Sequence, residues 1–319
     1  GLLVHKHGRG TYDHNNIFLN QGSGVIIRKN GKPHLRGNRI YQCDGSGVYA
    51  ENEAEGIIEE NEIYEHDACG VYAESRSTLE LRDNFIHTCK KHGICITSFA
   101  NCKVERNKIC LNAESGIDIS HSAQGNVLHN EIHDGKGPGI HIHNSGAGFI
   151  EANEIYQNLT GVEIQKGGAP TLRGNNIHRS IKYGVHVHNS GLGLIETNDI
   201  TQNAEAAVMV ETGGNSTFKG NIIVDNLQMG IYVHNVGEGT FEANKIFGNQ
   251  QEGVLVDKES KPVFTNNEIF DGQFVGIRVA DEGLGTYKDN RLHHNQGPAV
   301  VIETHANPVF TNNKVYKGL

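Results

Sequence analysis

An asparagine recurs at a nearly constant spacing along all 319 residues of this chain, and this repeat constrains the fold more than any other feature. Successive members lie 23 residues apart, except for one interval of 22. The members are Asn15, Asn38, Asn61, Asn84, Asn107, Asn130, Asn153, Asn175, Asn198, Asn221, Asn244, Asn267, Asn290 and Asn313. A period of this length over a whole chain indicates a solenoid, in which one structural unit is copied end to end.

Each repeat contains the signals of about three short β-strands. A large apolar residue stands three positions before each asparagine and an aliphatic residue two positions after it, and a glycine often opens an alternating segment such as GVIIR at 24–28. No segment keeps the apolar spacing of a helix. Because equivalent positions carry the same residue type, the strands are expected to stack in parallel, coil on coil, with four or five inward apolar side chains per coil. The prediction is an all-β, single-stranded parallel β-helix of about 14 coils.

The asparagine column is expected to be structural. A side-chain amide can bond to the equivalent amide one coil above and one coil below, which forms a ladder. Asparagine also tolerates the left-handed backbone of a sharp turn, which we expect at these positions. A second, interrupted column is expected to serve another turn, and its members are Asn20, Asn112, Asn158, Asn203, Asn226, Asn249 and Asn295.

Composition excludes several classes of protein. The repeat crosses residues 1–319 without a linker, which favours a single domain, and the start on a repeat glycine suggests an excerpt of a longer chain. A net charge of -9, with no basic run, argues against a nucleic-acid partner. No apolar stretch approaches the roughly 20 residues that a membrane span needs.

The cysteines give no sign of a disulfide framework. All six (Cys43, Cys69, Cys89, Cys95, Cys102 and Cys110) lie in the first third of the chain, and no two share a repeat position in adjacent coils. Free thiols favour a reducing compartment, cytoplasmic or nuclear. One column, Cys43, His66 and Cys89, lacks a fourth ligand for a metal and is interpreted as a set of turn residues. Neither a metal site nor a cofactor is predicted.

Titratable residues gather on the outer side of the first strand of each coil. Between the sixth and twelfth coils, two outward columns bring together the densest such patch on the chain. These candidate ligand-binding residues are Asp118, His141, His143, Glu163, His186, His188, Glu211, Tyr232, His234 and Asp257. A carboxylate beside a histidine could perform acid–base chemistry or bind a divalent metal, but histidines that recur with the repeat are more often part of the scaffold. No catalytic residue is assigned.

The repeat alternates between two types, which together form a superrepeat of about 46 residues. One type carries glycines and an acidic tail, as in GAGFIEANEIY at 146–156, and the other carries proline and a basic tail, as in GKPHLRGNRIY at 31–41. This alternation resembles the right-handed, pectin-lyase-like β-helix repeats called CASH, for carbohydrate-binding and sugar-hydrolase. It is most similar to the β-helix domain of F-box-only ubiquitin ligase subunits. The resemblance implies a right-handed β-helix that captures a protein substrate, whereas bacterial and archaeal relatives are carbohydrate proteins of the cell surface or periplasm.

Three functional hypotheses follow. The preferred one is a non-catalytic recognition module that binds a protein segment or a polysaccharide along the first-strand face, as in an F-box-type substrate receptor. The alternative is a polysaccharide lyase, epimerase or hydrolase that acts through His141, His186, His188, Glu163 and Glu211, or a carbohydrate-binding surface protein. Lyase calcium clusters, hydrolase aspartate pairs and the Asp-Pro-His signature of mannuronan epimerases are absent from the sequence. Constant coil length, which leaves no loops to wall a cleft, argues against an enzyme. A structural spacer is the third hypothesis.

Overall fold

The protein is a parallel β-solenoid built from three strands per coil. The structure, a computed structural model, describes residues 1–317, and every regular element within that range is a β-strand. The strands fall into three parallel sheets, named A, B and C in the order in which a coil visits them. Two compact units, Gly1–Leu159 and Thr160–Leu319, are described separately below. The prediction of an all-β solenoid is confirmed, and the single-domain interpretation stays a prediction.

The first unit contains seven coils, β1–β21. Its sheet A consists of β1 (Leu2–His5), β4 (Val25–Arg28), β7 (Val48–Glu51), β10 (Val71–Ala73), β13 (Ile94–Ile96), β16 (Ile117–Ile119) and β19 (Ile140–Ile142). Its sheet B consists of β2 (Arg9–Asp13), β5 (Lys32–Arg36), β8 (Glu55–Glu59), β11 (Thr78–Arg82), β14 (Asn101–Glu105), β17 (Gln124–Leu128) and β20 (Ala147–Glu151). Its sheet C consists of β3 (Asn16–Phe18), β6 (Arg39–Tyr41), β9 (Glu62–Tyr64), β12 (Phe85–His87), β15 (Lys108–Cys110), β18 (Glu131–His133) and β21 (Glu154–Tyr156).

The second unit repeats this plan in the seven coils β22–β42. Its sheet A consists of β22 (Val162–Ile164), β25 (Val185–Val187), β28 (Val208–Glu211), β31 (Ile231–His234), β34 (Val254–Val256), β37 (Ile277–Val279) and β40 (Val300–Ile302). Its sheet B consists of β23 (Ala169–Arg173), β26 (Leu194–Glu196), β29 (Thr217–Lys219), β32 (Thr240–Glu242), β35 (Val263–Thr265), β38 (Thr286–Lys288) and β41 (Val309–Thr311). Its sheet C consists of β24 (Asn176–His178), β27 (Asp199–Thr201), β30 (Ile222–Val224), β33 (Lys245–Phe247), β36 (Glu268–Phe270), β39 (Arg291–His293) and β42 (Lys314–Tyr316).

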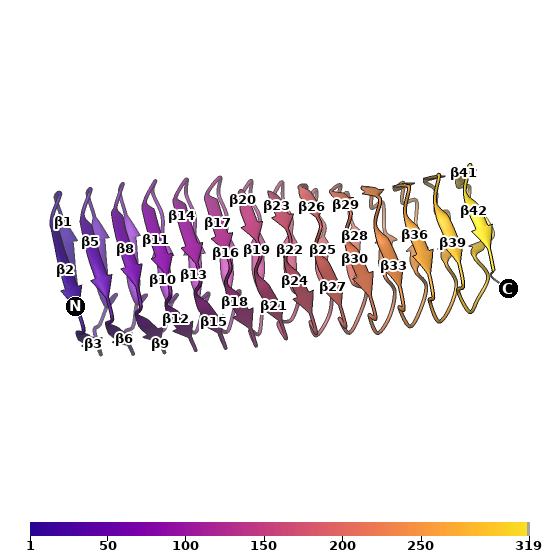
Figure 1. Cartoon of the computed structure of the whole chain (residues 1–319). Coiled ribbons are helices and arrows are strands. Elements are labelled where there is room, and N and C mark those ends of the chain that lie inside the picture. The colour runs from indigo at the N-terminus through magenta and orange to yellow at the C-terminus, as the bar shows by residue number, and fades with distance from the viewer. Residues whose placement is uncertain (318–319) are drawn as a thin grey trace. The chain divides into compact units, whose positions relative to one another are not determined.

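Register within each unit follows the sequence repeat. Strands of successive coils lie side by side in parallel (Figure 1), and β10 pairs with β13 so that Tyr72 lies opposite Cys95, 23 residues later. A typical coil sends four or five apolar side chains inward, as predicted. In the fourth coil these side chains are fully buried and belong to Val71, Ala73, Leu79, Leu81 and Ile86. A residue one position along the strand therefore points outward, and the outward positions of sheet A form the columns that the sequence indicated.

The asparagine ladder is present, but one expectation about it is wrong. Asn61 donates its backbone N–H and its side-chain Nδ2 to Oδ1 of Asn84, both at 3.0 Å, and Nδ2 also donates to a backbone carbonyl. The left-handed residue of this turn is the preceding one, Glu60, with φ of 56°. The turn therefore demands its unusual backbone one position earlier, where Gly37 occurs in another coil with φ of 62°. Asparagine is needed at the ladder position for its amide.

The prediction that the cysteines are free thiols is confirmed, and His66 of the Cys43–His66–Cys89 column forms hydrogen bonds with the backbone. All six cysteines are free thiols with buried side chains. The His66 imidazole occupies a position of the second asparagine column: Nδ1 accepts the backbone N–H of Cys43 at 3.3 Å, and Nε2 donates to the carbonyl of Ile40 at 3.0 Å. Burial lowers the pKa of His66 to about 4, so the ring stays neutral and serves as a ladder amide would. No helix among residues 1–317 is long and apolar enough to cross a membrane.

Candidate functional site

The candidate site residues of the first unit lie on the outer face of its sheet A. The middle side chain of most of these strands is half-buried, as for Tyr49, Tyr72 and His141. Asp118, in the middle of β16, departs from this pattern, because only 4% of its surface is exposed. The sequence predicted an outward surface carboxylate. The prediction of direction is right but that of exposure is wrong, because side chains of the next coil cover the carboxylate.

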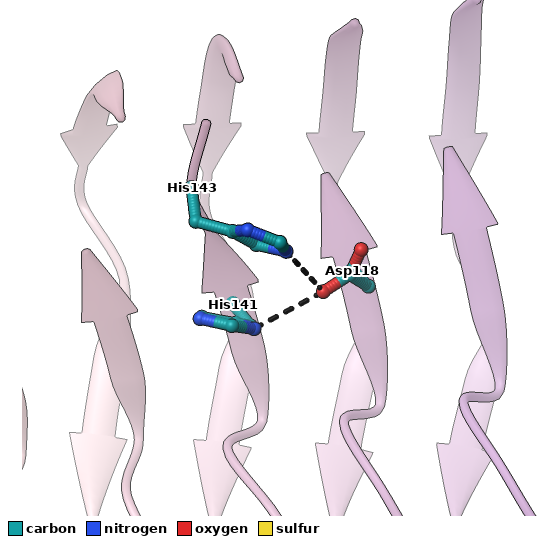
Figure 2. A group of neighbouring side chains, drawn as sticks. All are labelled: Asp118, His141 and His143. Carbon is teal, nitrogen blue, oxygen red and sulfur yellow. Dashed lines mark hydrogen bonds and ion pairs between the residues drawn. The ribbon is translucent and has the colours of Figure 1, made fainter. Parts of the chain in front are cut away.

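Two imidazoles converge on this carboxylate. Asp118 Oδ1 accepts hydrogen bonds from His141 Nδ1 and His143 Nε2, each at 3.1 Å (Figure 2). Both rings come from the adjacent coil, where β19 and the residue after it place them 23 and 25 positions beyond the aspartate. The rings stack at 4.2 Å between centroids with an interplanar angle of 17°. Parallel register therefore suffices to assemble a carboxylate and two imidazoles from a single residue and a His-x-His pair.

Electrostatics in this cluster favour the ionised carboxylate. Burial by itself raises the pKa of Asp118, but the hydrogen bonds from His141 and His143 outweigh it and hold this pKa below its usual range. The neighbouring His92 behaves differently, since burial lowers its pKa and favours the neutral ring. His92 Nδ1 accepts the backbone N–H of Ser115 at 3.2 Å, so the proton is on Nε2, which lies 3.0 Å from a Glu114 oxygen. The cluster thus combines one anion with hydrogen-bonding imidazoles.

Residues from the turns complete the site. His121 Nδ1 lies 3.1 Å from both the Thr97 and the Ser120 hydroxyl oxygens, just beyond the ends of β13 and β16. The thiols of Cys69 and Cys95 also border this face and lie against each other. The hydrogen bond between these thiols lowers the pKa of Cys69 and raises that of Cys95. None of these residues was among the ligand-binding candidates predicted from the sequence. The sequence did contain a signal for turn residues of this kind. A residue two positions before or after a sheet A strand borders the outer face of that sheet, beside the outward side chains of the next coil.

Two adjoining depressions run along this face. One, of about 430 Å³, is lined by the Asp118 cluster together with Tyr72, Lys91, His92 and His121. The other, of about 320 Å³, includes Tyr49 and shares Cys69, Tyr72 and Lys91 with the first. A larger depression of about 600 Å³ follows the turns after sheet A near Phe99, but it holds no comparable cluster of imidazoles. We place the site at the Asp118 depression because shape and ionisable groups coincide there.

The seven remaining candidates lie on sheet A of the second unit. His188 Nε2 lies 2.9 Å from a Glu163 oxygen, and His186 Nε2 lies 3.0 Å from a Glu211 oxygen. Burial is the main cause that lowers the pKa of His186, and the charge of His188 adds to it. The stack of His186 on His188 has the same centroid distance, 4.2 Å, and interplanar angle, 17°, as that of His141 on His143.

The last three candidates form a different cluster in that unit. Asp257 Oδ1 lies 2.7 Å from His234 Nδ1, and its Oδ2 accepts the Tyr232 hydroxyl at 2.9 Å. Asp257 was expected to lie on the surface but is only 7% exposed, because Tyr232 and His234 cover it. The structure therefore brings the ten candidates into carboxylate–imidazole clusters within each unit. Their role in ligand binding stays a prediction.

Solved structures with the same fold include polysaccharide-modifying enzymes. The periplasmic alginate epimerase AlgG is 12% identical, with a TM-score of 0.63 over 92% of this chain and 76% of that one. The A-module of the mannuronan C-5 epimerase AlgE4 of Azotobacter vinelandii is 12% identical, with a TM-score of 0.50 over 90% of this chain and 87% of that one. At such identities the likeness concerns the fold alone.

Sequence comparison identifies the family but no individual relative. No curated protein matches the chain, and the relation to F-box-only ubiquitin ligase subunits is not shown by these comparisons. The family described as "Right handed beta helix region" matches residues 1–130, 115–261 and 228–318. These matches extend over nearly the whole chain and agree with the three parallel sheets. The chain belongs to the right-handed β-helix family.

Proposed function

We propose that this protein binds an acidic polysaccharide along the outer face of sheet A. One observation carries the proposal: the two adjoining depressions of the first unit form a continuous track, lined by tyrosines at one end and by the Asp118 cluster at the other. Tyr49 and Tyr72 stack with centroids 5.5 Å apart and offer partly exposed aromatic surface of the kind that packs against sugar rings. A linear polymer matches a site that extends along the coils.

The hydrogen-bond donors of the track favour a sugar acid over a neutral sugar. Around the Asp118 depression, one lysine and four histidines face two carboxylates. Lys91 and the imidazoles can donate hydrogen bonds to a carboxylate on the sugar, and charged partners strengthen such bonds. The named relatives by fold act on alginate or mannuronan, which agrees with this class of ligand. We therefore favour the polysaccharide hypothesis over the capture of a protein substrate, which the resemblance to F-box-only subunits implied.

A binding assay with matched variants tests this proposal. Isothermal titration with polymannuronate and polygalacturonate should show binding that weakens with salt, and uncharged dextran should bind far less. His143→Gln removes an imidazole of the Asp118 depression and should weaken binding by about tenfold, the equivalent of roughly 1.4 kcal/mol. The control is His14→Gln, which changes an exposed histidine in the turn between β2 and β3 of the same unit. Binding of peptides but of no glycan would refute the proposal and favour a protein-substrate receptor.

Acid–base conversion of the bound sugar is a second candidate function, and the geometry of Asp118 favours it. An imidazole that donates to a carboxylate through Nε2, as His143 does, has its proton and orientation fixed, and the lone pair on Nδ1 can accept a proton. Incubation with the same polymers, followed by proton NMR, would detect epimerised or unsaturated residues. Conversion by the parent protein that is lost in Asp118→Asn, while binding persists, would support catalysis. Binding without any conversion would leave recognition as the function.

A further inference from the structure

The Asp118 cluster has the donor set of a transition-metal site. One oxygen of Asp118 and one nitrogen each of His141 and His143 all lie within 4.8 Å of one another. The carboxylate oxygen is 3.1 Å from each of the two nitrogens. Two imidazoles and a carboxylate suit zinc and its neighbours in the first transition row, whereas calcium and magnesium prefer oxygen ligands alone.

The spacing of these atoms fits a tetrahedral ion. Zinc–ligand bonds of about 2.0–2.1 Å at tetrahedral angles separate ligand atoms by roughly 3.3 Å. The observed 3.1 Å between Asp118 and each imidazole nitrogen is close to this value. A bound ion would replace the two imidazole protons that now point at the carboxylate, and each ring would pass its proton to its other nitrogen or to solvent. Since the rings stack at 17°, both must tilt to direct their lone pairs at the ion.

A similar set of donors recurs in the second unit at the same sequence spacing, although His186 Nε2 there lies 3.0 Å from Glu211. Glu163, His186 and His188 also place three ligand atoms within 4.8 Å of one another, and the histidines again follow the carboxylate by 23 and 25 positions. A later coil offers a contrast, because Tyr232 and His234 are preceded at the equivalent position by Met209. That coil supplies one imidazole where the triads supply two.

We propose that Asp118, His141 and His143 bind one divalent transition-metal ion, for which zinc is the probe. Three protein ligands leave a fourth position for water or a ligand group, as in zinc sites that activate a bound molecule. This position would face the depression lined by His92 and His121. The inference is independent of polysaccharide binding, because it depends only on the donor atoms.

Metal titration with matched variants tests the site. Protein stripped with EDTA is dialysed against zinc sulfate, and the bound zinc per chain is measured by mass spectrometry. We expect His143→Gln to bind one zinc fewer than the parent protein, and His188→Gln to lose the zinc of the second triad. His234→Gln is the control and should bind as much zinc as the parent. If His143→Gln and the parent bind equal amounts of zinc, including none, the proposal is overturned.

A second variant separates metal loss from misfolding. His143→Cys keeps three ligands, so it should still bind the ion, and after loading with cobalt it should gain a sulfur-to-cobalt absorption band that the parent lacks. Circular dichroism and thermal unfolding confirm that each variant folds. A folded His143→Cys protein without this band would overturn the assignment. If the protein binds zinc but none of the glycans, the proposed function is refuted and the proposal of a metal site stands.

Discussion

Removal of one ladder amide tests what holds the coils together. In Asn107→Ala the side chain loses five hydrogen bonds. Its Nδ2 donates to Asn130 Oδ1 at 3.0 Å, to the Leu81 carbonyl at 2.9 Å and to the Glu105 carbonyl at 3.1 Å. Its Oδ1 accepts the backbone N–H of Asn84 at 3.0 Å and the Asn84 Nδ2 at 2.8 Å. Two backbone bonds survive the change: the Asn107 N–H still donates to Asn130 Oδ1, and the Asn107 carbonyl still accepts the Glu131 N–H.

The free energy of unfolding should fall by about 3–6 kcal/mol. One hydrogen bond makes a net contribution of about 0.5–1.5 kcal/mol to stability. Five hydrogen bonds made by a single side chain contribute less than five independent bonds would. The larger part of the loss comes from groups left without partners. Asn84 and Asn107 are each no more than 2% exposed, so the Asn84 backbone N–H has no water to replace Oδ1. A buried group of this kind costs about 1–3 kcal/mol.

Denaturant unfolding followed by circular dichroism measures this loss. The control is Asn101→Ala, since Asn101 is an exposed residue of the neighbouring strand β14 and this change should alter stability by no more than about 0.5 kcal/mol. If Asn107→Ala were as stable as Asn101→Ala, the ladder would contribute nothing beyond what the strands already provide. The asparagine period would then need another explanation.

Three further predictions follow from buried polar groups. Imidazole hydrogen bonds outweigh burial and depress the pKa of Asp118, so its stabilising effect is present above pH ~4 and disappears as the pH falls further. Asp118→Asn should therefore lower the free energy of unfolding less at pH 3 than at pH 7. An equal decrease at the two pH values would contradict this account of Asp118. The free energy of unfolding of His66→Asn should lie within ~1 kcal/mol of that of the parent protein. That of His66→Ala should be about 1–3 kcal/mol lower, measured by the same denaturant unfolding. The six buried thiols should react with Ellman's reagent far more slowly in the folded protein than in guanidinium, and rapid labelling of the folded chain would refute their burial.

The fold could be predicted from the sequence because the inward residues and the ladder repeat without interruption. Apolar pairs such as Ile117 and Ile119 fix which face of a strand is buried, and a period of 23 residues fixes the register of each coil on the next. The left-handed position was misplaced for a physical reason. Asparagine is common both at left-handed positions and in ladders, and only the structure separates the two roles, with Glu60 taking the first and Asn61 the second.

The candidate site was only partly predictable. Column positions identified Asp118, His141 and His143 as neighbours, because parallel register places residues 23 positions apart in contact. Burial of Asp118 could not be predicted, since it depends on which way the imidazole rings turn. His92 was missed because it precedes its strand and reaches the site from a turn, where no period-2 alternation reports the direction of a side chain.

The β-helix separates the residues that specify its backbone from those that form its surface sites. Ile140 and Ile142 are fully buried and hold β19 in register, while His141 between them can change without altering the core. Substitutions at outward positions should therefore change binding more than stability, and inward substitutions should do the reverse. Asp118 is the informative exception, because it is an outward residue that two imidazoles have enclosed. An outward residue whose substitution changes both binding and stability therefore marks the position of a functional site on the surface of this scaffold.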